Sequence, residues 1–163
     1  MKNRKNSATG RQLDGKALGA TLIHLAVKHR EEVALKELSQ DRVVVEFLVL
    51  CRFQLTLLGV GRWNRIAKSM LAGLHEEFVA FDPEYEDLFE ARMERYFKAT
   101  ENVAGEDLLR CLVDDWACCV GVSTDVATWA FEVLVESSTV FLELISAVGR
   151  DASRTPCSRR VDK

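Results

Sequence analysis

The sequence predicts an all-α fold: a single-domain bundle of about six helices with disordered basic tails. Three observations lead to this prediction. Apolar residues recur with the period of a helix in every segment between about residues 13 and 148. Only two prolines interrupt the 163 residues, and Asp14-Gly15 is the one dipeptide typical of a tight hairpin turn. The composition, 48% apolar and 29% charged, is that of a globular chain long enough to bury a core.

The N-terminal half contains the segment around which the bundle is predicted to form. Residues 1–12 are polar and basic, so we expect a disordered tail. From 13 to 38 an apolar stripe predicts either one long helix or a helix broken at 29–32. Residues 41–58 predict a helix that is apolar on nearly every side. Its polar residues gather on one narrow arc: Asp41, Arg42, Glu46, Arg52 and Thr56. A helix so apolar belongs in a core, with the other helices around it.

The middle of the chain predicts two further helices. A clean apolar stripe indicates a helix over 63–80. Asp82 then supplies an N-cap and Pro83 the first position of the next helix, which we expect to end near Asn102.

The C-terminal part predicts the last two helices. Residues 106–120 form a shorter helix closed by Gly121, and Ser123 caps a long helix over about 125–148. Apolar residues cover about two thirds of the wheel of that long helix, more than one packing face requires. We expect residues 149–163 to be a disordered basic tail, which leaves 13–148 as the helical domain.

The charge distribution argues against nucleic-acid binding by the folded part. The net charge is −3, but residues 17–148 carry 22 acidic and 12 basic groups, a balance that repels phosphate backbones. Both ends are basic, and contacts of these ends with nucleic acid or anionic lipid stay open; we favour solvated tails. No uncharged apolar run reaches the roughly 18 residues of a membrane span.

The cysteines and histidines provide no complete metal-binding or catalytic motif. Five cysteines without a Cys-x-x-Cys pair predict a reduced, cytoplasmic chain. Cys111, Asp115 and Cys118 share one helix flank, but a zinc or iron site needs further ligands, so we expect no metal and no cofactor. No histidine follows a glutamate by three residues, as a di-iron bundle requires. We assign no catalytic residue, and whether the chain is an enzyme stays open.

One charged residue breaks its helical pattern. Arg92 lies in the middle of the apolar stripe that ends at Tyr96, where a guanidinium needs a partner. Glu46 and Asp115 are available carboxylates, and we favour a structural ion pair that fixes the helix register. The alternative is a small-molecule-binding or enzymatic site in a pocket lined by Arg92, His75, Tyr96 and Glu46.

A short motif resembles a known pattern. The residues Leu88-Phe89-x-x-Arg92-Met93-x-x-Tyr96, after an aromatic-Asp-Pro helix start, resemble a pattern in small uncharacterised all-helical bacterial proteins. This resemblance covers only the motif; it implies a bacterial, soluble, helical protein and transfers no activity.

We expect the chain to be a non-catalytic protein–protein interaction or assembly module. The surplus apolar surface of the last helix is the basis of this expectation. A partner protein, or a second copy of the chain, would contact it through Phe131, Val135 and Leu142, because twofold dimers need a self-complementary apolar patch. Burial of these side chains within the chain is the alternative, which we weigh slightly higher.

Overall fold

The computed structural model describes residues 4–28, 40–59 and 64–153, which form six helices and no strand. The helices are α1 (Arg4–Lys28), α2 (Gln40–Gly59), α3 (Asn64–Phe81), α4 (Glu84–Thr100), α5 (Glu106–Val120) and α6 (Thr124–Ser153). The predicted all-α class and the number of helices are confirmed. Within the described residues, no helix is both long and apolar enough to cross a membrane.

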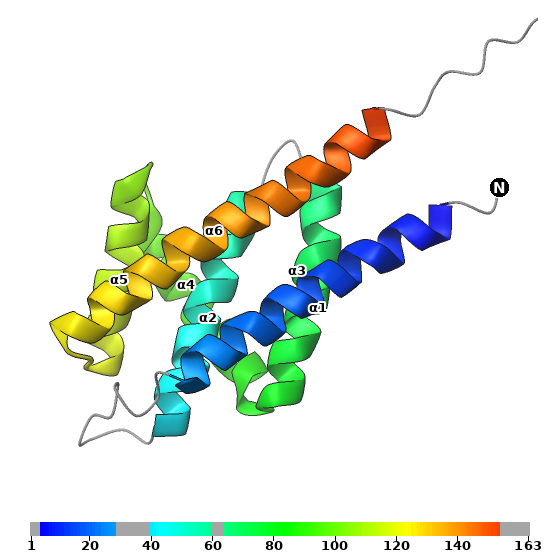
Figure 1. Ribbon diagram of the computed structural model, residues 1–163. Helices are drawn as coiled ribbons and strands as arrows, with labels where there is room; N and C mark the ends of the chain where they lie inside the picture. Colours follow the sequence, from blue (N-terminus) through cyan, green and yellow to red (C-terminus); the bar gives the residue numbers. More distant parts are fainter. Residues whose placement is uncertain (1–3, 29–39, 60–63, 154–163) are drawn as a thin grey trace, which may run out of the picture.

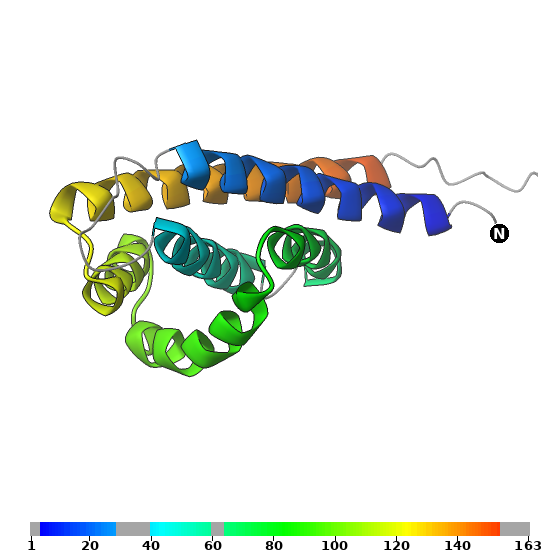
Figure 2. The ribbon, with the colours of Figure 1, turned by 90° about the horizontal axis from the view of Figure 1, so that it is seen from below.

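The helices form layers around α2. The two longest, α1 and α6, lie side by side and antiparallel in one layer that covers α2 and α3 (Figures 1 and 2). Helix α4 lies on the opposite side of α2, and α5 closes the end of the bundle next to the start of α6 (Figure 2). The layer of α1 and α6 therefore forms one complete face of the molecule.

Helix α2 is the core of the bundle, as its apolar sequence predicted. It contacts all five other helices. Its residues from Leu48 to Cys51 have no solvent-exposed surface. The Phe47 ring centroid lies 4.7 Å from that of Trp129, and the Phe53 centroid lies 5.3 Å from that of Tyr96. Aromatic contacts on both halves of α2 thus join it to α4 and α6.

The first helix begins earlier than the sequence predicted. We expected disorder over residues 1–12, but α1 begins at Arg4. Close packing against α3 explains the difference: a Cβ atom on Gly15 or Gly73 would collide with the backbone of the facing helix. Glu76 accepts a hydrogen bond from Gln12 at 2.7 Å, which holds the first part of α1 against α3. Contacts with α3 near Gln12 therefore continue the helix into a segment that has no apolar stripe.

The last helix also runs further than expected. We placed its end at Gly149, but α6 continues to Ser153. A single glycine inside a helix costs about 1 kcal/mol, which a helix of this length tolerates. The predictions for residues 29–39, including the break or turn at 29–32, and for 154–163 fall outside the described residues.

The predicted caps are present. The Asp82 carboxylate accepts a hydrogen bond from the Glu84 backbone N–H at 2.9 Å, and Pro83 has helical dihedral angles. Gly121 adopts the left-handed conformation and ends α5. The Ser123 hydroxyl accepts a hydrogen bond from the Val126 N–H at the start of α6. Local sequence signals therefore set these boundaries.

Candidate functional site

Arg92 forms the ion pair that the sequence predicted. Its Nε donates to Glu46 Oε2 at 3.1 Å and its Nη2 donates to Glu46 Oε1 at 2.8 Å. The Arg92 side chain is 24% exposed to solvent, and the Glu46 side chain is 4% exposed. Arg42 Nε lies 3.5 Å from Glu46 Oε1, so two cations share the buried carboxylate. The hydrogen bond with Glu46 raises the pKa of Arg92, and this pairing favours a structural role.

Asp115, the other candidate partner of Arg92, pairs with Arg95 instead. Arg95 donates from Nε and Nη2 to the two carboxylate oxygens at 2.7 and 2.9 Å. The flank that Asp115 shares with Cys111 and Cys118 therefore contains an engaged carboxylate. Among the described residues, no three histidine, cysteine or acidic side chains are grouped in a way that could hold a metal ion.

The four predicted ligand-binding residues are not gathered in one place. Arg92 and Glu46 join α4 to α2, and the buried Tyr96 ring lies close enough for both to affect its hydroxyl. Burial raises the pKa of Tyr96 above its usual value. His75, on α3, instead packs its ring 5.4 Å from that of Tyr85 and lines a cavity between α2, α3 and α4. The sequence had grouped His75 with residues of a different interface.

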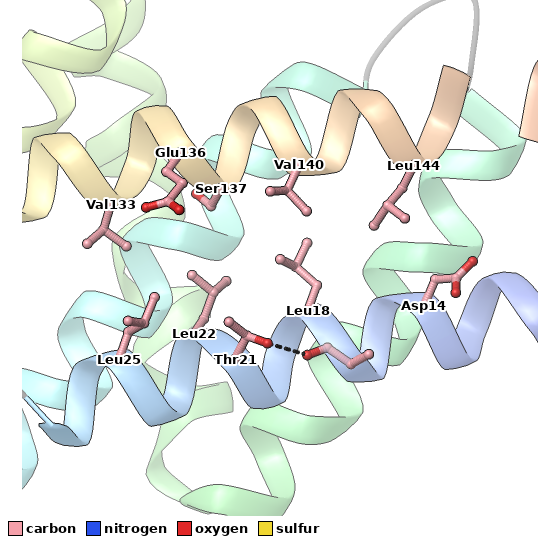
Figure 3. A pocket seen from close by; sticks show the side chains of 11 residues that line it. Asp14, Leu18, Thr21, Leu22, Leu25, Val133, Glu136, Ser137, Val140 and Leu144 are labelled. Carbon is pink, nitrogen blue, oxygen red and sulfur yellow. Dashed lines mark hydrogen bonds between the residues drawn. The ribbon is translucent and has the colours of Figure 1, made fainter. Parts of the chain in front are cut away.

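A groove between α1 and α6 was not predicted. It has a volume of about 260 Å³, and apolar side chains from the two helices point toward each other across it (Figure 3). These side chains are Leu18, Leu22 and Leu25 of α1 and Val133, Val140 and Leu144 of α6. Its lining extends along α1 from Asp14 to Leu25, about 17 Å at the rise of an α-helix. That length corresponds to about three helical turns.

The polar residues that line the groove are acidic or neutral. Asp14 of α1 and Glu136 of α6 contribute the two charged groups of the lining, and both are carboxylates. Ser137 and Thr21 add hydroxyls, but the Thr21 hydroxyl donates to the Ala17 backbone oxygen at 3.0 Å. Figure 3 shows the acids on the opposed helices, with the apolar side chains between them. The groove thus combines an apolar floor with negative charge.

The patch predicted for self-association lies on another side of α6. Val135 and Leu142 are each 42% exposed, and Phe131 is half-buried. The Arg110 guanidinium carbon lies 5.6 Å from the Phe131 ring centroid and covers part of that ring. Val135 is displaced from the groove residue Val140 by about 140° around the helix axis. Beside its core face, which contains Leu134 and Phe141, helix α6 therefore presents two further apolar surfaces, and this explains the width of its apolar arc.

Comparison with known proteins adds no assignment to this geometry. No protein-family model matches the chain, and neither curated proteins nor solved structures gave a match. The functional argument therefore rests on the groove, on the cavity beside His75 and on the charges around them.

Proposed function

We propose that this chain is a non-catalytic interaction module that binds an amphipathic helix of a partner protein in the groove between α1 and α6. The observation that carries the proposal is the groove itself. Apolar side chains line it on both long sides over about three turns, the length of a helix that anchors through positions i, i+4 and i+7. Val140 stays 38% exposed within this lining and is available to a partner.

The charge of the groove favours a basic partner helix. Asp14 and Glu136 lie on opposite sides of the apolar floor. The segment 17–148 has an excess of acidic groups, 22 against 12 basic ones, which attracts a cationic helix and disfavours a second copy of this body. A partner helix with leucine-type residues on one face and lysine or arginine on its flanks fits both features.

A labelled peptide tests this proposal. The peptide is a helix of about five turns with leucines at i, i+3, i+4 and i+7 and lysines elsewhere. We expect a saturable rise in its fluorescence anisotropy when the full chain is added. A second peptide, with glutamates in place of the lysines, should bind more weakly because Asp14 and Glu136 repel it. The absence of saturable binding by the lysine peptide would contradict the proposal.

Two substitutions on the same helix separate the groove from the rest of the surface. Val140→Asp places a charge in the groove, and we expect roughly tenfold weaker peptide binding or more. Val135→Asp is the matched control, since Val135 has similar exposure but lies outside the groove lining. Equal losses in the two variants would show that the peptide does not bind in the groove.

Self-association through Phe131, Val135 and Leu142 is the second candidate. The exposure of Val135 and Leu142 favours it, because these two side chains are available to a second copy. Sedimentation of the wild type and of Leu142→Glu tests it: a dimer that the substitution splits into folded monomers supports twofold pairing. A monomeric wild type at tens of micromolar concentration ends this candidate.

We also place this module in the cytoplasm of a bacterial cell. Four described cysteines are free, and Cys118 is exposed, a state that a reducing compartment preserves. Fractionation of a bacterial host that expresses the chain tests this location; recovery with periplasmic or secreted proteins would contradict it.

A further inference from the structure

A second cavity, lined by α2, α3 and α4, contains cationic groups that the interaction proposal does not use. Its volume is about 630 Å³, and it is open to solvent. Three basic side chains line it: Arg52 of α2 and Lys68 and His75 of α3. Its other lining residues are Thr56, Gly59, Ala67, Leu71, Ala72, Glu76 and Phe89. None of these residues lines the groove between α1 and α6.

Arg52 has no carboxylate partner among the described residues. Its Nη1 donates to the Thr56 hydroxyl, and its guanidinium carbon lies 5.3 Å from the Phe89 ring centroid. Its Nε is buried and has no hydrogen-bond partner in the described part of the chain. Tyr85 lies nearby, but burial raises the pKa of its hydroxyl, so it provides no negative charge. Arg52 is therefore a partly buried cation to which no described residue supplies a counter-ion.

Two acids at this cavity have partners other than Arg52. Glu76 lies 3.0 Å from Lys16 Nζ and accepts a hydrogen bond from Gln12. Glu86 lies 3.7 Å from the Nε2 atom of His75. Both contacts direct these carboxylates to partners other than Arg52. The charge of Arg52 is thus left for another group, whereas His75 has the Glu86 carboxylate beside it.

His75 adds a second unpartnered donor or acceptor. Its Nδ1 is buried and forms no hydrogen bond with a described residue. Lys68 lies seven positions earlier on α3, so both residues are on the same side of that helix. Buried polar atoms in folded proteins nearly always have partners, and Arg52 Nε and His75 Nδ1 show that two side chains of this cavity wall have hydrogen-bonding capacity that the described residues do not use.

We infer that this cavity binds a small organic anion, a carboxylate or phosphate group on an apolar body. Arg52 binds the anionic group with its guanidinium fork, and Lys68 adds a second positive charge. The apolar body packs against Phe89 and Leu71, which lie in the same lining. A neutral ligand would leave the charge of Arg52 uncompensated.

Titration of the full chain with two aromatic anions tests this inference. The probes are benzoate and phenyl phosphate, followed by amide chemical shifts in NMR spectra, with benzamide as the neutral control. We expect saturable shifts at residues of α2 and α3 around the cavity with at least one anion, and none with benzamide. The probe that binds more tightly then shows whether the cavity prefers a carboxylate or a phosphate group. Inorganic phosphate that binds as tightly as phenyl phosphate would contradict the apolar part of the site.

Substitutions assign the binding to Arg52. Arg52→Met should weaken binding of the preferred anion by roughly tenfold or more, because a charge-assisted hydrogen bond is lost. Arg110→Met is the matched control: it removes one positive charge and the contact with the Phe131 ring but lies outside the cavity. Arg52→Lys, which keeps the charge, should bind better than Arg52→Met. No saturable binding of either anion, or equal losses in the Arg52 and Arg110 variants, would overturn the inference.

The outcome is independent of the peptide test. The groove and the cavity share no lining residue, so peptide binding by Arg52→Met should equal that of the wild type. A failure at one site therefore does not count against the other.

Discussion

Arg92 and Arg52 cross the same interface in opposite directions and find different partners. Arg92 extends from α4 to Glu46 of α2, whereas Arg52 extends from α2 to the Phe89 ring of α4. The hydrogen bond with Glu46 raises the pKa of Arg92, but burial lowers the pKa of Arg52. The charge of Arg92 is thus compensated by Glu46, whereas within the described segments no carboxylate compensates that of Arg52.

This difference shows how a structural charge can be told from a binding charge. A guanidinium that meets a carboxylate in two hydrogen bonds fixes the register of two helices. A guanidinium that is desolvated and meets only a hydroxyl and an aromatic ring lowers stability until an anion arrives. Because methionine keeps most of the volume without the charge, the same substitution at three arginines measures this difference.

The largest effect is expected at Arg92. Arg92→Met leaves the Glu46 carboxylate, which is 4% exposed, without its main partner. We expect the free energy of unfolding to fall by about 2–3 kcal/mol. This is less than the roughly 3–5 kcal/mol for a fully buried pair, because Arg42 stays 3.5 Å from Glu46. Urea unfolding followed by circular dichroism measures it.

The double variant Arg92→Met with Glu46→Gln tests the cause of that loss. If the orphaned carboxylate is responsible, the double variant should regain most of the stability. A double variant that is less stable by the sum of both single losses would show that packing, not charge, explains the effect of Arg92→Met.

A smaller effect is expected at Arg95, which has the same bonding pattern on the surface. Its two hydrogen bonds with Asp115 are as short as those between Arg92 and Glu46, but 43% of the Arg95 side chain is exposed. Solvent screens such a pair, so Arg95→Met should lower the free energy of unfolding by less than about 1 kcal/mol. A loss equal to that of Arg92→Met would show that burial does not distinguish the two pairs.

The sequence predicted the parts of this structure that local patterns determine. The apolar periods predicted six helices, and Asp82, Gly121 and Ser123 marked their ends. Arg92 was recognised because it interrupts an apolar stripe, and its partner Glu46 was one of two candidates. In these cases a few neighbouring residues contain the signal, except for the choice of Glu46 over Asp115, which depends on how the helices pack.

The rest depends on how the helices pack. The early start of α1 includes Gln12, whose backbone closely approaches Gly73 of α3. The periodicity of apolar residues does not reveal this contact. The groove exists because α1 and α6 leave part of their apolar faces uncovered, and sequence alone does not tell which faces meet.

Arg52 was assigned to a polar arc and was not singled out. One sequence signal was available: no acid lies three or four positions from Arg52 on either side. That Glu76 of α3 and Glu86 of α4 also turn to other partners is visible only in three dimensions.

The stability of Arg52→Met in buffer without organic anions tests the central claim most directly. If the charge of Arg52 is uncompensated in the free chain, its removal leaves the free energy of unfolding unchanged or raises it by about 1 kcal/mol. The contact between Arg52 and the Phe89 ring then contributes little to the free energy of unfolding. A decrease of more than about 1 kcal/mol, approaching that of Arg92→Met, would contradict the account, because Arg52 would then be a structural residue like Arg92.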